Sequence, residues 1–299
     1  GQLHNQRLGL CICLDDTVLN MIYLYYLFNS HNVRSQIQAS ANGAKVRHTS
    51  PSRIYEVEAF FPSLLTQQKV ASILLNYDNL IENNTRRIQI LEEMAQRIYK
   101  EWFVDFKYPG HENDKLVDSE LGMIPDGWKI VKVSSLLKRL KAGSKYTKNN
   151  VSENGLIQVI DQSEKEILGY HDNEPDHLAT KNNPIIIFGD HTCKMQLLVE
   201  PFSIGPNVIP FISKLNHSIY FLYYLVNSLV ETKEYKRHWN DMIDKSVIIP
   251  NKVLPNRFSD IVSSLFKQIA VLKRLNQNLS QTRDFLLPKL ISGEVNVSE

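Results

Sequence analysis

Two stretches of the chain carry apolar residues at steps that alternate between four and three. The first stretch covers residues 70–102 and the second covers residues 258–290. An alternation that persists over four or more heptads is typical of helices that pack as a coiled coil. Helices of ~35–40 residues are ~55–60 Å long at about 1.5 Å per residue. The pattern therefore predicts two long helices that pair with each other, antiparallel, and act as a spacer.

Asn84 and Asn276 interrupt these two apolar seams at positions where a polar residue commonly fixes the register of paired helices. Pro288 comes late in the second stretch, where we expect it to kink or stop the helix. The seam positions are Val70, Leu74, Tyr77, Ile81, Asn84, Ile88, Leu91, Ala95, Ile98 and Trp102 in the first helix, and Phe258, Val262, Leu265, Ile269, Leu272, Asn276, Leu279, Arg283, Leu286 and Leu290 in the second.

The two seams belong to an internal repeat. Residue 70 corresponds to residue 258, and this offset of 188 holds along the whole apolar pattern. Further upstream, residues 23–30 match residues 221–228 at an offset of 198. Because a repeat determines the architecture, we expect two similar units. The N-terminal copy looks truncated, since it lacks a counterpart to roughly residues 128–205.

The segments outside the seams mix helical and strand patterns. Short β-rich runs are separated by clusters of Gly, Asn and Asp, which are typical of turns. This predicts an α+β fold class, with mixed α/β domains joined by the two long antiparallel coiled-coil helices. We expect strands at 8–14, 54–61, 156–160, 184–188, 197–199, 208–212 and 247–249, and shorter helices at 17–30 and 216–229. Residues 128–133 (WKIVKV) lead into a further helical pattern that begins with two serines.

Composition narrows the class of protein. The chain has 299 residues, and its 34 basic against 32 acidic side chains give a net charge of +2, which neither demands nor excludes nucleic acid. It lacks a run of about 18 apolar residues, so we expect no transmembrane helix. Three cysteines are too few for a disulfide framework and favour a reducing, cytoplasmic compartment. Cys11 and Cys13 have no second pair, so we expect neither a metal site nor a cofactor.

Two short strings resemble catalytic motifs but lack essential parts. Asn183-Pro184 is without the second proline and the aromatic residue of the amino-methyltransferase motif, and is better explained as a turn before a strand. Asp190-His191 with Cys193 contains a nucleophile and a base, but adjacency in sequence does not make a catalytic dyad. We therefore expect a loop contact there and no catalysis by this chain.

Polar loop residues are the better functional candidates, because phosphates and base edges are bound by cationic, amide and hydroxyl groups. Lysines near a glycine suit phosphate contacts, a tyrosine suits stacking, and a glutamine pairs bidentately with adenine. For each of them, a solvated or structural side chain is the alternative that the sequence leaves open. The candidates are Lys145, Tyr146 and Lys148; Gln162 and Gln196; His191, Thr192 and Lys194; Lys45, Arg47 and His48 in the N-terminal repeat; and Lys236 and Arg237 at the related place in the second.

Several strings resemble one protein family. Residues 80–84 (LIENN), 91–96 (LEEMAQ) and 102–106 (WFVDF) resemble the first long helix of type I restriction–modification specificity subunits. Residues 122–128 (GMIPDGW) are similar to the lead into the second target-recognition domain of that family, and residues 283–293 (RDFLLPKLISG) resemble the end of its second helix. The resemblance covers essentially the whole chain.

The resemblance implies a domain organisation. Its boundaries are 1–64 for the C-terminal part of a first recognition domain, 65–107 for the first spacer helix, 108–127 for a linker, 128–255 for the second recognition domain, 256–291 for the second helix and 292–299 for a tail. Family members usually carry two complete recognition domains, so the chain is expected to be truncated at its N-terminus. We expect that its first domain needs a second copy of the chain or an N-terminal fragment to complete it.

The resemblance also implies a function without chemistry in this chain. Such a subunit reads a bipartite site in double-stranded DNA and docks two methyltransferase subunits, and motor-nuclease subunits join for restriction. Two other hypotheses stay open at this point. One is a coiled-coil scaffold that never touches DNA, and the other is a recognition region cut from a fused restriction–methylation enzyme.

Overall fold

The computed structural model describes residues 11–40, 50–144, 146–214, 218–227, 229–232, 234, 236–251 and 253–297. The chain divides into two compact units. The first unit consists of Gly1–Ile88 with Val271–Glu299, and the second unit consists of Gln89–Ala270. Each unit is described below by itself.

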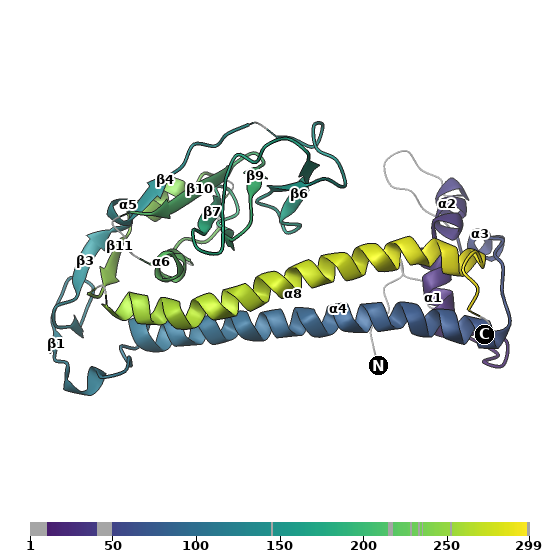
Figure 1. Cartoon of the computed structure of the whole chain (residues 1–299), viewed down its shortest axis with the longest axis horizontal. Helices are drawn as coiled ribbons and strands as arrows, with labels where there is room; N and C mark the ends of the chain where they lie inside the picture. Colours follow the sequence, from purple (N-terminus) through teal and green to yellow (C-terminus); the bar gives the residue numbers. More distant parts are fainter. Residues whose placement is uncertain are drawn as a thin grey trace. The chain divides into compact units, whose positions relative to one another are not determined.

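Two long helices, drawn in Figure 1, confirm the prediction from the seams. Helix α4 spans Leu64–Tyr99 and continues as a π-helical turn, Lys100–Val104. Helix α8 spans Val253–Ser292. Of the two effects expected of Pro288, a kink or a stop, the stop is wrong, because α8 continues past the proline to Ser292. Proline removes a single backbone hydrogen bond there, and burial of Leu290, which is 5% exposed, holds the final turn in place.

The helices pair in antiparallel register inside each unit. In the first unit Asn84 faces Asn276, with 2.9 Å between amide nitrogen and amide oxygen. Val70 lies fourteen residues before Asn84 on α4, and Leu290 lies fourteen residues after Asn276 on α8. These two residues share one core, as the antiparallel register requires. In the second unit the rings of Trp102 and Phe258 lie 6.3 Å apart. None of the twenty predicted seam positions is exposed, as coiled-coil packing requires.

The second unit contains most of the strands. The strands predicted at 156–160, 184–188, 197–199, 208–212 and 247–249 largely hold, whereas the strands at 116–117, 124–125, 137–139, 167–171 and 202–204 were not predicted. The expected linker is also ordered, with a short hairpin, and Tyr108 in it stacks on Trp128. The elements are β1 Leu116–Val117, β2 Ile124–Pro125, β3 Lys129–Lys132, α5 Val133–Leu136, β4 Leu137–Arg139, β5 Ile157–Ile160, β6 Ile167–His171, β7 Ile185–Gly189, β8 Met195–Leu198, β9 Phe202–Ile204, β10 Val208–Ser213, α6 Ile219–Val226, α7 Trp239–Ile243 and β11 Ser246–Ile249.

A four-stranded antiparallel sheet, in the order β4-β10-β7-β8, separates two cores of this unit. Side chains alternate along β7: Ile186 and Phe188 join the core that includes α6 and the long helices, and Ile185 and Ile187 join the other. That second core includes residues of the sheet β6-β5-β9, in which β5 runs parallel to β9. An apolar run on a strand thus reflects burial on both faces.

The first unit is helical in its described part. Helices α1 (Met21–Asn29), α2 (His31–Ser40) and α3 (Pro51–Tyr55) precede α4. Asn20 caps α1 by accepting a hydrogen bond from the Tyr23 backbone at 2.9 Å, and Ser218 caps α6 by accepting from Phe221 at 3.2 Å. These residues correspond at the offset of 198, so the repeat extends to the helix caps.

Two strand predictions in the first unit are wrong. Residues 51–55 form α3, and residues 56–63 have no regular structure. Of the strand expected at 8–14, residues 8–10 lie outside the described residues, and 11–14 are not a strand. Leu14 is 98% exposed. A strand needs a neighbour to satisfy its backbone, and the described part of this unit offers no β-strand as a partner.

Candidate nucleic-acid interface

Three loops of the second unit meet at one place, which we call the three-loop surface: residues 161–166, 189–194 and 236–238. The backbone N–H of His191 donates to Gln162 Oε1 at 3.0 Å, and Thr192 Oγ1 donates to the Gln162 carbonyl at 2.9 Å. His191 Nδ1 lies 3.0 Å from the carbonyl of Lys236. Six of the thirteen predicted DNA-binding residues are thereby brought together: Gln162, His191, Thr192, Lys194, Lys236 and Arg237.

Asp190 fixes the third of these loops. Its carboxylate Oδ1 accepts the backbone N–H groups of His238 and Trp239 at 3.1 and 3.0 Å. These N–H groups open helix α7, which has no cap from its own N-cap side chain. A carboxylate at a helix N-terminus satisfies donors that the helix itself leaves unpaired. Asp190 thus joins the loop after β7 to the start of α7.

The loop after β7 has a defined backbone shape. Gly189 leaves little room for a side chain, because a Cβ there would lie 2.5 Å from Thr192 Oγ1 and 2.8 Å from Gln162 Cβ, so these groups would have to shift. Cys193 adopts a left-handed conformation with φ of 55°. Burial raises the pKa of the Cys193 thiol, which disfavours the reactive thiolate. With His191 bonded to a backbone carbonyl, this geometry favours the loop contact over a nucleophile and base.

The cationic side chains of the three-loop surface differ in their exposure and in how closely a carboxylate pairs with them. Lys194 Nζ lies 3.3 Å from Glu166, and Lys236 Nζ lies 3.0 Å from Asp241. Arg237 has a side chain that is 77% exposed, and its Nε is 3.8 Å from the buried Asp190 carboxylate. Arg237 is therefore well placed to reach a phosphate or a guanine edge.

The two predicted glutamines have different surroundings. Gln162 Oε1 holds the backbone of His191, so this amide orients a loop. Gln196 lies on β8, and its amide nitrogen is buried without a hydrogen-bond partner. As placed, Gln196 does not display its amide donor at the three-loop surface.

Tyr146 is buried, which the sequence did not signal. Its ring stacks on His171 with centroids 4.2 Å apart and planes 8° apart. His171 Nδ1 accepts from the Asn173 backbone at 3.1 Å, and its Nε2 lies 3.0 Å from the hydroxyl of Ser203. This serine–histidine pair is buried, and among the described residues no hydrogen bond joins the histidine to a carboxylate, so we interpret the pair as a structural contact.

The remaining predicted contacts are either exposed or undescribed. Lys148 is exposed on the loop that follows Tyr146. Lys45, Arg47, His48 and Lys145 lie outside the described residues. Among the described residues, His, Cys, Asp and Glu form no group of three or more able to hold a metal. In the same part of the chain, no helix combines the length and apolarity that crossing a bilayer requires.

Comparison with known proteins identifies proteins to which the chain is similar. No family model matches the chain. It is 28% identical over 302 residues to the type I restriction enzyme MjaIX specificity subunit of Methanocaldococcus jannaschii, covering 93% of this chain and 69% of that protein. The chain is homologous to type I restriction specificity subunits. This agrees with the prediction of a subunit that is not itself the enzyme.

Other specificity subunits match in part or in fold. The HindI specificity subunit of Haemophilus influenzae is 49% identical over 45 residues, which cover 15% of this chain and 10% of that protein. The crystal structure of a type I restriction–modification S subunit from M. genitalium has a TM-score of 0.54 at 16% identity and covers 93% of this chain and 74% of that one. The specificity-subunit fold, with strands and long helices, is therefore shared, and the predicted α+β class is confirmed.

Proposed function

We propose that this chain is the DNA-specificity subunit of a type I restriction–modification complex. It reads a bipartite site in double-stranded DNA, docks adenine-methyltransferase subunits and, through them, motor-nuclease subunits. Homology along 93% of the chain to a named specificity subunit carries the proposal. The three-loop surface supports it, because three loops, which follow β5, follow β7 and precede α7, hold cationic and polar groups close together.

The three-loop surface has the chemistry for both kinds of DNA contact. Arg237 offers a forked donor for a phosphate or for guanine. Lys194 and Lys236 already pair with carboxylates, so their contribution to phosphate binding requires exchange of these partners. Gln162 and Thr192 set the loop shape, which decides where the cations point.

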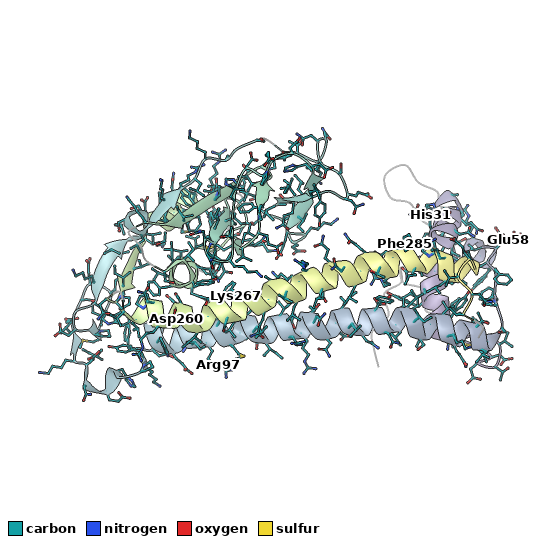
Figure 2. All side chains as sticks on the ribbon, viewed as in Figure 1. His31, Glu58, Arg97, Asp260, Lys267 and Phe285 are labelled. Atoms are coloured by element: carbon teal, nitrogen blue, oxygen red, sulfur yellow. The ribbon has the colours of Figure 1, made fainter. Side chains whose placement is uncertain are left out.

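Replacing Arg237 with alanine is expected to weaken DNA binding and its salt dependence. Loss of one phosphate contact reduces the slope of log K against log salt by about 1. The DNA is selected from a random double-stranded library by the unaltered chain, and its affinity is then measured at several salt concentrations. Lys267→Ala, on the exposed face of α8 labelled in Figure 2, is the matched control and should bind as the unaltered chain does.

The DNA-binding assay, together with an assay for adenine methylation, decides between the competing hypotheses. A coiled-coil scaffold would select no sequence from the library and show no salt-dependent binding. A fused enzyme would methylate adenine without any added methyltransferase subunit. Mapping of methylated adenines in cells with and without the chain and its partner then identifies the site. Methylation by the chain alone would overturn the proposal.

The methyltransferase docking surface is proposed on helix α4 in the second unit. Ile90 and Met94 are each 47% exposed and lie one helical turn apart. Exposed charged residues, Glu93 and Arg97, flank them, and Figure 2 labels Arg97 on this helix. An apolar pair with a charged rim is typical of a protein interface.

Introducing charge at this pair should prevent assembly and spare DNA binding. The variant Ile90→Glu/Met94→Glu is expected to retain at most about one tenth of the co-purifying methyltransferase subunit, because a carboxylate cannot be buried in an apolar contact without a partner. Leu156→Glu, at a site 83% exposed in the second unit and outside the helices, is the control. Equal retention by both variants would place the docking surface elsewhere.

A further inference from the structure

The polar residues of the paired helices do not follow the internal repeat. At the offset of 188, Asn84 of α4 corresponds to Leu272 of α8, and Asn276 of α8 corresponds to Ile88 of α4. Each helix therefore has one asparagine and one apolar residue at these two positions, in opposite order. Elsewhere the seams are mostly apolar on both sides, so this difference distinguishes the two helices.

The observed pairing matches polar with polar. Asn84 Nδ2 donates to Asn276 Oδ1 at 2.9 Å. Asn276 Nδ2 is 3.3 Å from the carbonyl of Ile81 and 3.1 Å from Thr85 Oγ1. Four residues along each helix, the same antiparallel register places Ile88 opposite Leu272, and both are buried. Both asparagines are thus satisfied and both apolar residues covered.

Pairing of like helices between two copies would break this match. The repeat makes α4 and α8 equivalent in shape, so two α4 helices would meet in the same register. Asn84 of one copy would then face Ile88 of the other. Two α8 helices would set Asn276 against Leu272. An amide at a helix interface that loses its partner is costly, because its hydrogen bonds with water are lost as well.

A second pair of positions follows the same rule. In the first unit, Arg283 donates to Asp78 Oδ1 at 2.5 Å, and the Tyr26 hydroxyl donates to the other carboxylate oxygen. At the offset of 188, Arg283 corresponds to Ala95, which is fully buried, and Asp78 corresponds to Phe266. Both counterparts lie in the second unit.

Like-with-like pairing would separate these charges too. Asp78 would lie beside Ala95 of the other copy, and Arg283 beside Phe266. Neither apolar residue can replace the ion pair. Four side chains thus favour the same arrangement.

We propose that Asn84, Asn276, Asp78 and Arg283 select the pairing of α4 with α8 and exclude pairing of like helices between two copies of this chain. The proposal is independent of DNA binding. It concerns the choice between folding within one chain and self-association of equivalent helices. A single polar position in the seam is known to set partner choice in coiled coils. Here two half-buried polar sites act in the same direction.

The test makes the two seams equivalent at the asparagine positions. The variant Asn84→Leu/Asn276→Ile, called the equivalent-seam variant, gives each asparagine position the residue that stands at the repeat-related position of the other helix. In this variant a leucine at position 84 faces an isoleucine at position 276 in the native pairing, as Leu272 already faces Ile88, so α4 still packs on α8. The relocated control keeps one asparagine on each helix but moves it by four residues. It carries the substitutions Asn84→Leu, Ile88→Asn, Leu272→Asn and Asn276→Ile. In the control, asparagine faces asparagine in the native pairing and an apolar residue in like-with-like pairing.

Interchain disulfides report the pairing of like helices. Ile81→Cys and Leu91→Cys are added to each full-length chain after Cys11, Cys13 and Cys193 are replaced by alanine. The two sites oppose each other only when two α4 helices pair, because in the native pairing they face Leu279 and Ile269. Circular dichroism and light scattering establish the helix content and mass of each variant.

The equivalent-seam variant is expected to give at least about tenfold more interchain disulfide than the unaltered seam, and the relocated control no more than the unaltered seam. A second variant, Asp78→Phe/Arg283→Ala, should also raise the yield. Equal yields from the unaltered and equivalent seams would overturn the proposal. So would an increase in the relocated control equal to that in the equivalent-seam variant.

Discussion

Replacing Phe258 with alanine is expected to lower the free energy of unfolding of the second unit by about 3–5 kcal/mol. Phe258 has no exposed surface. Its ring lies 5.4 Å from Phe103, 5.8 Å from Tyr224 and 6.0 Å from Tyr99. Truncation removes apolar burial and leaves a cavity in a cluster of large rings that cannot close around it.

Urea unfolding monitored by tryptophan fluorescence measures this loss. All three tryptophans, Trp102, Trp128 and Trp239, belong to the second unit, so the signal reports on that unit. Val253→Ala, on the same helix and in the same unit, is the control: its side chain is 65% exposed, and the expected change is within about 0.5 kcal/mol. Similar losses in both variants would show that the ring cluster does not hold α8 in place.

Replacing Asp190 with alanine is expected to have the second largest effect. The Trp239 N–H at the start of α7 loses its acceptor, and the His238 N–H keeps only the Asp190 carbonyl at 2.8 Å, which costs about 1 kcal/mol of stability. The loop that carries Arg237 then loses its anchor. We therefore expect DNA affinity to fall at least as far as it does for Arg237→Ala.

Asp190→Asn separates anchoring from charge. The amide keeps an acceptor for the helix and removes a negative charge close to Arg237. This variant should bind DNA as tightly as the unaltered chain or more tightly, since phosphates are repelled less. Affinity is measured on the selected double-stranded site at one fixed salt concentration. If the asparagine variant loses as much affinity as the alanine variant, Asp190 does not act by positioning the loop.

The two helix seams could be predicted from the sequence because apolar periodicity is a property of neighbouring residues. Apolar periodicity and length indicate a long packed helix without knowledge of its partner. Strands near the N-terminus were not readable in this way. Tyr55, Val57 and Ala59 alternate as in a strand, but residues 51–55 form α3, since strand pairing needs a neighbour that the described first unit lacks.

The candidate interface could be read only in part. Residue type drew attention to His191 and Arg237 as candidates, but their proximity depends on three loops separated by up to about 75 residues, which only the folded unit brings together. Tyr146 and Gln196 look like binding groups in sequence. Burial against His171 and within the sheet gives them different surroundings, and burial of a loop tyrosine has no local signature.

The sequence by itself determined the repeat, the two long helices, their antiparallel pairing and the family that the chain resembles. These follow from periodicity and from short strings, which are properties of neighbouring residues. Only the tertiary structure decided that Asp190 caps α7, that Gln162 orients the loop of His191, and that α4 and α8 match their polar residues with each other. Each of these is a contact between distant segments, and its energy depends on distances that folding alone creates.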